Sequence, residues 1–426
     1  MSNCAIVGVN WGDEGKGRMV DLITENYDIV IRYQGGGNAG HTIINEFGKF
    51  ALHLLPSGIF RKNVVNILGP GVALDPENLL IEIKMIVEAG IKITPENLKI
   101  SDRCSILFPW HRKLDELEEN RLKDKKYGST KQGIAPFYSD KYAKKSIMLG
   151  ELFDERFPER LKDLLEFKNL YIENFYKAEP YTYEEILQWV KQFCEPIKPF
   201  IFDIGTYLDK AVNEEHKGVV FEAQLGSLRD LDFGIYPYTT SSNTLSSYAP
   251  IGSGAPFISI DQVIGVAKAY STCVGEGPFV TEFFGKEAEE LREFGLEYGA
   301  KTGRPRRVGA FDVVATRYGV KVQNTTDVAL TKLDVLSYLD RIPVCVAYKS
   351  KDGLVHHFPF PSKLKDMEPV IEHLPGWKKD ITSIRKFEDL PKEAQDYVIF
   401  IEERIGAHIT YVSVGPERDQ IIIRKK

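Results

Sequence analysis

The chain has 426 residues, of which 43% are hydrophobic and 27% charged, a composition typical of a soluble globular protein with a sizeable core. Its formal net charge of −6 argues against a nucleic-acid partner, because nucleic-acid-binding surfaces carry a basic excess. No apolar run approaches the roughly 18 residues of a membrane span, so we expect no membrane partner. Five scattered cysteines without a C-x-x-C pair indicate reduced thiols, and we find no signal peptide. The sequence therefore predicts a cytoplasmic protein.

The N-terminal part of the chain predicts the start of a parallel α/β sheet. The apolar run 4–10 indicates a buried strand, which a glycine-rich loop connects to a helix over 16–25. A second strand over 28–34 leads into another glycine loop at 35–42. Because loops at the carboxyl ends of parallel strands gather at one edge of the sheet, we expect both glycine loops to face a single pocket.

The rest of the chain continues with strands, helices and hairpins. Segment 42–55 predicts a hairpin, and 65–90 predicts a strand, a turn and a helix that Asp75 caps. Segment 150–200 predicts helices without recognisable chemistry. The other predicted elements are strands over 218–226 and 327–336 and a strand–turn–strand unit over 409–424. Without repeats or linkers, we predict a single α/β domain over 1–426, with a central mostly parallel β-sheet, flanking helices and small hairpin subdomains.

The stretch GVNWGDEGKG at 8–17 is similar to a phosphate-binding loop but departs from the pattern G-x-x-x-x-G-K-[ST]. Its glycines let backbone N–H groups converge on an anion, and Lys16 adds a positive charge. The next residue is Gly17, which lacks the hydroxyl that holds magnesium in a P-loop. Asp13 can supply that contact, and its carboxylate can also act as a general base. The alternative is an ordinary strand-to-helix turn with surface charges.

Three further motifs are candidates for chemistry, although each also has an ordinary structural interpretation. His41 follows the second glycine loop and can stabilise charge on a leaving phosphate oxygen. The sequence TKLD at 331–334 resembles the guanine-reading element N-K-x-D. Asp334 can accept hydrogen bonds from N1–H and the 2-amino group of guanine, which predicts GTP rather than ATP. The basic loop 300–307 can bind carboxylates or phosphates.

Together these motifs resemble the adenylosuccinate synthetase family over nearly the whole chain and in the same order. The stretches that carry the resemblance are WGDEGKG (11–17), RYQGGGNAGHT (32–42), LHLLPSGI (52–59), YPYTTSSNT (236–244), GPFVTE (277–282), TGRPRR (302–307), TKLDVL (331–336) and SVGPER (413–418). The resemblance implies a GTP-dependent ligase of purine biosynthesis that joins IMP and L-aspartate, the first committed step from IMP to AMP. It also implies a cytoplasmic homodimer with GTP as co-substrate.

The resemblance implies a reaction in two steps. Asp13 takes the N1 proton of IMP, and the 6-oxyanion attacks the γ-phosphate of GTP with the assistance of His41 and Lys16. The amine of aspartate then displaces phosphate from 6-phosphoryl-IMP. One Mg²⁺ per subunit is expected to bind Asp13 and the carbonyl of Gly40.

The resemblance also implies a set of residues for each substrate. Those expected to bind GTP are Gly12, Asp13, Glu14, Gly15, Lys16, Gly17, Arg18, Gly40, His41, Thr42, Arg306, Lys332, Leu333, Asp334, Ser413, Val414 and Gly415. Those expected to bind IMP are Asp13, Asn38, Ala39, Gly40, His41, Thr130, Lys144, Gln224, Thr240 and Arg304. Those expected to bind aspartate are Ala300, Lys301, Thr302, Gly303, Arg304 and Arg306.

The departures from the family pattern cluster at the IMP and aspartate sites. The family sequence T-T-G-R-G-I-G-P is replaced by STKQGIAP at 129–136. Lys144 matches an arginine that reaches the IMP phosphate from the partner subunit, and Gln224 lies one place out of register in AQLG. Lys301 replaces a threonine, and Cys273 replaces an arginine.

Two alternatives stay open, one suggested by these departures and the other by the lysine loop together with TKLD. The first is a paralogous GTP-dependent ligase that uses another purine nucleotide or amine donor, against which the retained Asp13 argues. The second is a regulatory GTP-binding protein, which should carry Ser or Thr where this chain has Gly17.

Overall fold

The computed structural model describes residues 2–38, 40–45, 47–299, 303 and 305–425. The strands of its central sheet are β1 (Cys4–Gly8), β2 (Ile29–Arg32), β5 (Val65–Leu68), β6 (Leu98–Ser101), β7 (Ile201–Phe202), β8 (Val219–Glu222), β9 (Gln262–Lys268), β13 (Asp327–Thr331), β17 (Ile409–Ser413) and β18 (Ile421–Ile423). Their order is β18-β17-β13-β9-β1-β8-β2-β5-β6-β7. Neighbours in this described sheet are parallel, except that β18 runs antiparallel to β17.

Smaller sheets and helices surround the central sheet. The remaining strands are β3 (His41–Asn45) paired with β4 (Gly48–Leu52), β10 (Ser271–Cys273) paired with β11 (Arg307–Gly309), and a group formed by β12 (Phe311–Asp312), β14 (Arg341–Ser350), β15 (Gly353–Val355) and β16 (Glu368–Pro375). The α-helices are α1 (Lys16–Ile23), α2 (Pro76–Glu88), α3 (Pro109–Leu122), α4 (Ile134–Tyr142), α5 (Phe157–Leu170), α6 (Tyr183–Trp189), α7 (Ile204–Asp209), α8 (Ala249–Ser253), α9 (Gly285–Gly295), α10 (Val313–Val322) and α11 (Lys392–Ile405). The predicted α/β class with a mostly parallel sheet is confirmed.

The apolar run of β1 is buried on both faces because helices cover both sides of the sheet. Ala5 and Val7 pack in a cluster that includes residues of α7 and α8. Cys4 and Ile6 point to the opposite face and pack with residues of α1. This alternation explains why the strand reads as a continuous hydrophobic run in the sequence.

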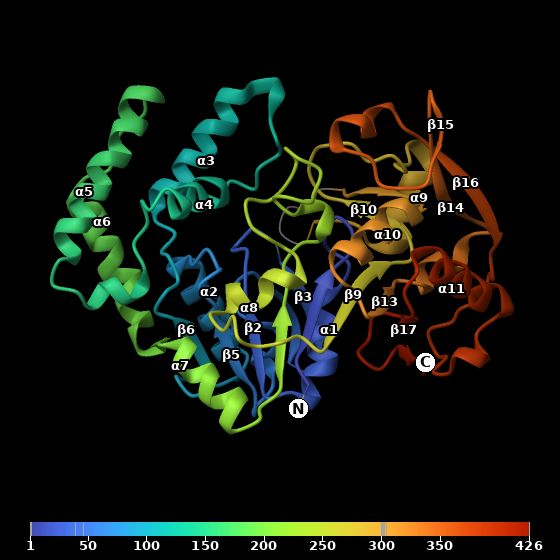
Figure 1. The fold of residues 1–426 in the computed structure, drawn as a ribbon, viewed down its shortest axis with the longest axis horizontal. Helices are drawn as coiled ribbons and strands as arrows, with labels where there is room; N and C mark the ends of the chain where they lie inside the picture. The colour runs from blue at the N-terminus through green and yellow to red at the C-terminus, as the bar shows by residue number, and fades with distance from the viewer. Residues whose placement is uncertain (1, 39, 46, 300–302, 304, 426) are drawn as a thin grey trace.

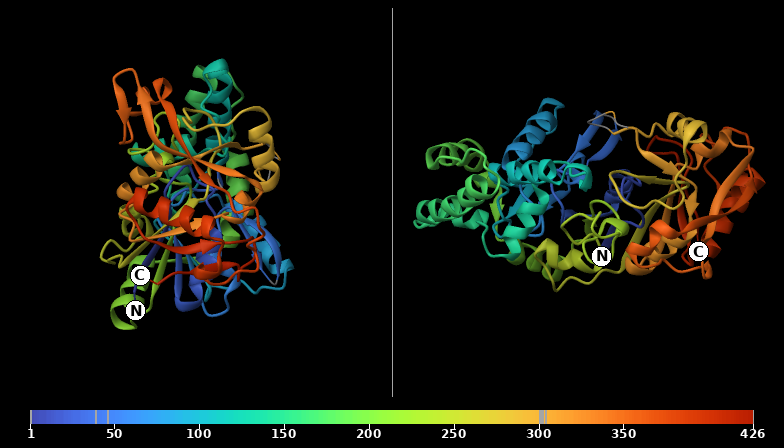
Figure 2. Two further views of the ribbon diagram at one scale, coloured as in Figure 1. Left: turned by 90° about the vertical axis from the view of Figure 1, so that its right-hand side faces the viewer. Right: turned by 90° about the horizontal axis from the view of Figure 1, so that it is seen from above.

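The molecule is longest across the sheet. Figure 1 shows α3, α4, α5 and α6 on one side of the central strands, and the segment after β13, with β14, β16 and α11, on the other side. The view from above in Figure 2 shows the same two groups at opposite ends of the molecule. The carboxyl ends of the central strands lie between these groups.

The predicted secondary structure is confirmed in type but not always in length. Asp75 caps α2 by accepting a hydrogen bond from the backbone N–H of Asn78 at 3.2 Å, and Pro76 is the first helical residue, as predicted. The strands predicted over 218–226 and 327–336 are too long, since β8 ends at Glu222 and β13 at Thr331. Beyond these ends the chain turns away from the sheet, which places the following polar residues at its edge.

Two expectations from composition concern thiols and membranes. All five cysteines are buried and free, which agrees with the reduced thiols inferred from their spacing. Among the described residues, the helices are too short or too polar to cross a bilayer.

One buried carboxyl group gives a testable pH dependence. Asp312 caps α10 and accepts a hydrogen bond from the hydroxyl of Tyr348 at 2.7 Å. Burial raises the pKa of Asp312 from 3.8 to about 6, against the effect of these hydrogen bonds. Between those two pH values the folded state binds more protons than the unfolded state, so stability falls as the pH rises.

We expect Asp312→Asn to remove this loss, because asparagine keeps the capping oxygen without the charge. The variant should gain up to about 3 kcal/mol relative to the parent between pH 4 and pH 7. Urea unfolding at both pH values measures this difference. An equal difference between the two proteins at both pH values would contradict the assignment.

Candidate active site

The two glycine loops are adjacent at the carboxyl end of the sheet, as predicted. The first follows β1 and leads into α1, and the second follows β2 and leads into β3. A Cβ atom at Gly17 would lie 2.9 Å from the Cβ of His41 and 3.3 Å from the hydroxyl of Ser57. The start of α1 therefore packs directly against His41.

This contact explains why the loop lacks the P-loop hydroxyl. Any side chain at Gly17 would collide with His41, so the position that carries Ser or Thr in a P-loop is occupied here by another residue of the site. We expect Gly17→Ala to lower kcat about tenfold or more by displacing His41. Gly17→Ser should be equally impaired in steady-state assays. A serine variant that is clearly more active than the alanine variant would show instead that a hydroxyl can hold metal there.

Glu14 organises the first loop from inside. Its carboxylate accepts hydrogen bonds from the backbone N–H groups of Asn10 at 3.2 Å and Gly12 at 2.8 Å. It also accepts a bond from the ammonium group of Lys16 at 2.7 Å, and both side chains are almost fully buried. The charge of Lys16 is thus shared with a neighbouring carboxylate, which the motif did not predict. Gly15, with φ of 100°, forms the turn into α1.

Asp13 lies at the open side of this loop. Its backbone is left-handed, with φ of 65°, and its side chain is one-third exposed. A guanidinium nitrogen of Arg306 lies 2.5 Å from its Oδ2 atom. The predicted general base and the predicted aspartate-site arginine are therefore in contact.

The oxygen atoms of Asp13 and Gly40 are suitable ligands for magnesium. A carboxylate and the backbone carbonyl of Gly40 are oxygen ligands, which Mg²⁺ prefers, and it commonly completes its shell with phosphate oxygens and water. Oδ2 of Asp13 is buried, and its described contact is the ion pair with Arg306. In the described parts of the chain, no group of three His, Cys, Asp or Glu residues could hold a metal without such substrate ligands.

His41 is oriented by a carboxylate that the sequence analysis missed. Its Nδ1 atom lies 2.5 Å from Glu222, the last residue of β8, which also accepts bonds from the N–H and hydroxyl of Ser57. Burial lowers the pKa of His41, while Glu222 opposes this shift. The pKa of Glu222 is lowered despite its burial, because of His41 and Arg32, so Glu222 accepts and Nδ1–H donates. The buried Nε2 atom has no partner and is available to a ligand.

The predicted guanine-reading residues come together from three segments. Leu333 donates its N–H to the carbonyl of Ser413 at 3.2 Å, which joins the TKLD element to the SVG element. Arg18, in α1, donates to the hydroxyl of Ser413 and to the carbonyl of Gly415, both at 2.7 Å. Burial raises the pKa of Asp334, and Arg18 opposes this shift. Val414 is buried, and Lys332 adopts φ of 64° at the end of β13.

Several predicted IMP-site residues present unpartnered polar atoms. The side-chain oxygens of Asn38 and Thr240 are buried without a hydrogen-bond partner, as is Nε2 of His41. Buried polar groups are normally satisfied, so such atoms from separate segments indicate a ligand site. Thr130, predicted to bind IMP, and Thr42, predicted to bind GTP, are exposed.

The variant loop 129–136 lies against the second glycine loop. Asp115 accepts hydrogen bonds from the hydroxyl of Ser129 at 2.7 Å and from the N–H of Gly133 at 2.8 Å. A Cβ atom at Gly37 would lie 3.8 Å from Oε1 of Gln132. The changed residues of this loop are therefore next to the loop that carries Asn38.

Gln224 forms a structural bridge in this chain. Its side-chain amide accepts from the N–H of Gly36 at 3.0 Å and donates to the carbonyl of Gly36 at 2.7 Å, and the residue is fully buried. The next residue, Leu225, is partly exposed with φ of 62° and approaches Gly12. The one-residue shift in AQLG therefore presents a leucine beside the first glycine loop.

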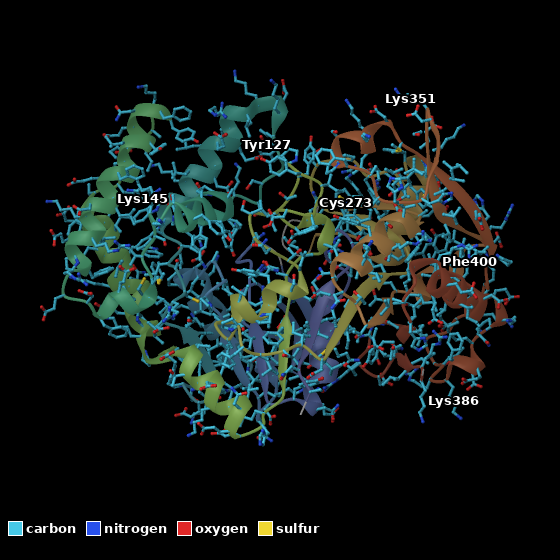
Figure 3. The ribbon with its side chains drawn as sticks, in the orientation of Figure 1. Tyr127, Lys145, Cys273, Lys351, Lys386 and Phe400 are labelled. Carbon is cyan, nitrogen blue, oxygen red and sulfur yellow. The ribbon has the colours of Figure 1, made fainter. Side chains whose placement is uncertain are left out.

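The thiol at the other variant position lies between two arginines. Arg229 lies 3.0 Å and Arg307 3.9 Å from Sγ of Cys273, and Arg229 is nearly buried. Cys273 lies near the middle of the molecule, and Tyr127 lies above it on the loop after α3 (Figure 3). Positive charge is retained at this position by guanidinium groups from other segments. Arg229 lies outside the sequence motifs described above.

Lys144 lies apart from the other described site residues of the same chain. It is exposed after α4 with φ of 61° and lines a cavity of about 400 Å³ beside α5. Its neighbour Lys145 appears in Figure 3 on the helical side of the molecule, away from Cys273. The predicted residues Ala39, Ala300, Lys301, Thr302 and Arg304 lie outside the described residues. Gly303 has φ of 63°.

This combination of features defines a class of protein. A glycine-rich loop that carries an aspartate and a lysine lies at one edge of a parallel sheet, with a buried carboxylate–imidazole pair and the predicted guanine-reading element. This arrangement is typical of a nucleotide-dependent phosphoryl-transfer enzyme.

Known proteins identify the family within this class. The adenylosuccinate synthetase family model matches residues 5–422. The chain is similar to adenylosuccinate synthetase of Halothermothrix orenii, with 45% identity over 100% of this chain and 99% of the relative. It is 46% identical to adenylosuccinate synthetase 2 of Pseudoalteromonas translucida, over the full length of both. A structure of fully ligated adenylosuccinate synthetase from Plasmodium falciparum superposes with a TM-score of 0.93 at 36% identity, over 100% of both chains.

The chain belongs to the adenylosuccinate synthetase family. The family, the fold class and the ligase class expected from the sequence are thereby confirmed. A purely regulatory GTP-binding role is not supported.

Proposed function

We propose that this chain joins IMP and L-aspartate at the expense of GTP, with the residues of its own site in the following roles. The observation that carries the proposal is a set of polar atoms from three segments, namely the buried, unpartnered side-chain atoms of Asn38, His41 and Thr240 together with the carboxylate of Asp13, which contacts Arg306. These atoms offer a carboxylate, an amide, an imidazole and a hydroxyl, which suit a purine nucleotide with ionisable and oxo groups.

Asp13 acts as the general base for N1–H of IMP. Arg306 contacts this carboxylate at 2.5 Å and offers its guanidinium group to phosphate or to the carboxylates of aspartate. His41 stabilises the transferring phosphoryl group through Nε2. The negative charges of Glu222 and of phosphate both favour the imidazolium form that donates this bond. Lys16 supplies a positive charge at the first loop.

Asp13 and the carbonyl of Gly40 would hold magnesium, which would supply positive charge to neutralise the phosphates. The loop glycines keep the backbone close to the phosphates, while Arg18, Lys332, Asp334 and the backbone around Ser413 read guanine.

Aspartate binds to the loop from residue 300 to Arg306. The proposal also includes a single integrated domain and a cytoplasmic homodimer. Lys144 would reach the IMP phosphate of the partner subunit, because within one chain it lies away from the other described site residues.

Lys144→Ala is expected to raise the KM for IMP about tenfold, because a charge-assisted bond to phosphate is lost. The KM for GTP should stay within twofold. Lys145→Ala is the matched control, since the ammonium of Lys145 lies 4.7 Å from the ring centroid of Phe167. Equal losses for both substrates would refute the assignment of Lys144 to the IMP phosphate.

The proposed function is tested by product formation with Mg²⁺, GTP, IMP and L-aspartate. Parallel reactions replace GTP by ATP, IMP by GMP or dGMP, and aspartate by other amines. Adenylosuccinate formed only with GTP and IMP supports the proposal. Turnover only with another acceptor would mean that the changes at 129–136 and 223–226 altered the substrate, as in the paralogous-ligase alternative.

A further inference from the structure

Glu297 is a buried carboxylate that was not among the predicted site residues, and it lies close to two predicted site cations, Arg306 and Lys332. Glu297 is 0% exposed and follows α9, where Leu296 turns the chain with φ of 52°. Its carboxylate accepts hydrogen bonds from Lys268 at 2.9 and 3.0 Å, from the hydroxyl of Tyr270 at 2.5 Å and from Arg306 at 2.6 Å. The ammonium of Lys332 lies 3.9 Å away.

This cluster spans the ends of two central strands. Lys268 is the last residue of β9, and its register partner is Thr331, the last residue of β13. Lys332 follows immediately and also donates to the carbonyl of Gly295 at 2.6 Å. The carboxylate of Glu297 therefore lies where the guanine-reading element leaves the sheet.

The charges of the cluster require the carboxylate to be ionised. Burial alone would raise the pKa of Glu297, but Lys268, Lys332 and Arg306 lower it to about 2. Lys268 is 4% exposed, and its remaining described bond goes to the hydroxyl of Thr272 at 2.9 Å. A buried ammonium needs such a partner, so Glu297 keeps these cations in fixed positions.

Arg306 extends the cluster to the proposed general base. One guanidinium nitrogen bonds to Glu297 at 2.6 Å, and the other lies 2.5 Å from Asp13. The backbone N–H of Arg306 also donates to the carbonyl of Glu297 at 2.9 Å. Both the main chain and the side chain of Arg306 are thus attached to one residue.

We propose that Glu297 is a positioning residue for GTP, which fixes Lys332 at the guanine end and Arg306 at the phosphate end of the nucleotide site. It does not touch the substrate itself. Because one carboxylate bonds to Arg306 and attracts the ammonium of Lys332 from 3.9 Å, while the carbonyl of Gly295 accepts a bond from that ammonium, the separation of the two cations is set before the nucleotide binds. This proposal rests on the proposed GTP site, and it predicts a selective effect on GTP rather than a general loss of folded enzyme.

The test compares Glu297→Gln with Glu282→Gln. Glu282 is the matched control, because it forms a two-pronged ion pair with the neighbouring arginine, Arg307, at 2.8 and 2.5 Å. Binding of a non-hydrolysable GTP analogue with Mg²⁺, and of IMP, is measured by calorimetry on each full-length variant. We expect Glu297→Gln to weaken the GTP analogue at least tenfold and to leave IMP within twofold, while Glu282→Gln leaves the analogue unchanged.

A folded Glu297→Gln variant that binds the analogue like the parent would overturn the proposal, as would equal weakening of the analogue and IMP. If Glu297→Gln does not fold, Tyr270→Phe removes one bond to the carboxylate and keeps the charge. It should weaken the analogue about threefold, and unchanged binding would then overturn the proposal. Since binding is measured without turnover, failure of the parent to form adenylosuccinate would refute the proposed function separately.

Discussion

Asp13→Asn is expected to lower kcat for adenylosuccinate formation by about 10³-fold or more. Asparagine keeps the size of the side chain but cannot accept the N1 proton of IMP, and general bases contribute about 10²- to 10⁴-fold. Loss of a magnesium ligand adds to the effect. Single-turnover and steady-state product assays measure the change.

The control for this variant is Asp352→Asn, in the exposed turn between β14 and β15, which should keep full activity. Calorimetry with IMP and an unfolding curve establish that Asp13→Asn is folded and binds its acceptor. Retention of more than a tenth of the parent activity would remove Asp13 as the base.

Asp334→Asn is expected to reduce kcat/KM for GTP at least 100-fold and to raise that for xanthosine triphosphate. The carboxylate offers acceptors to both N1–H and the 2-amino group of guanine, whereas asparagine presents a donor that suits the 2-oxo group of xanthine. Sites that bond specific polar groups reject ligands that leave these bonds unmade.

The comparison uses rates with GTP, xanthosine triphosphate and ATP at fixed IMP and aspartate. Asp340→Asn serves as the control, because Asp340 is exposed and follows Asp334 closely in the chain. If GTP remained preferred by the Asp334→Asn variant, another group would have to read the base. If the KM for IMP rose equally, the substitution would have disturbed the whole site.

The departures from the family pattern acquire meaning only from their neighbours in space. The loss of an arginine at Cys273 is accompanied by Arg229, which brings a guanidinium from a segment 44 residues away in sequence. The shift in AQLG, in contrast, turns Gln224 into a link to Gly36 and presents Leu225 instead. The first change retains the charge, and the second changes the chemistry of the surface beside Gly12.

The sequence by itself determined the fold class and the main chemical groups. The hydrophobic runs of β1 and β2, each followed by glycines, were enough to predict parallel strands with loops at one edge. Asp13, Lys16, His41 and Asp334 could be selected because each lies in a short motif whose spacing is set by local backbone geometry.

Only the tertiary structure decided how these groups are held. Glu222 and Glu297 stand in no local motif. Glu222 meets His41 because β8 lies between β1 and β2 in the sheet, and Glu297 meets Lys268 because the end of β9 lies beside the end of β13. The order of the strands in the sheet depends on how the hydrophobic faces of whole helices and strands pack together. It cannot be read from the local sequence pattern of one segment. Contacts between distant charged side chains therefore become visible only once the sheet is assembled.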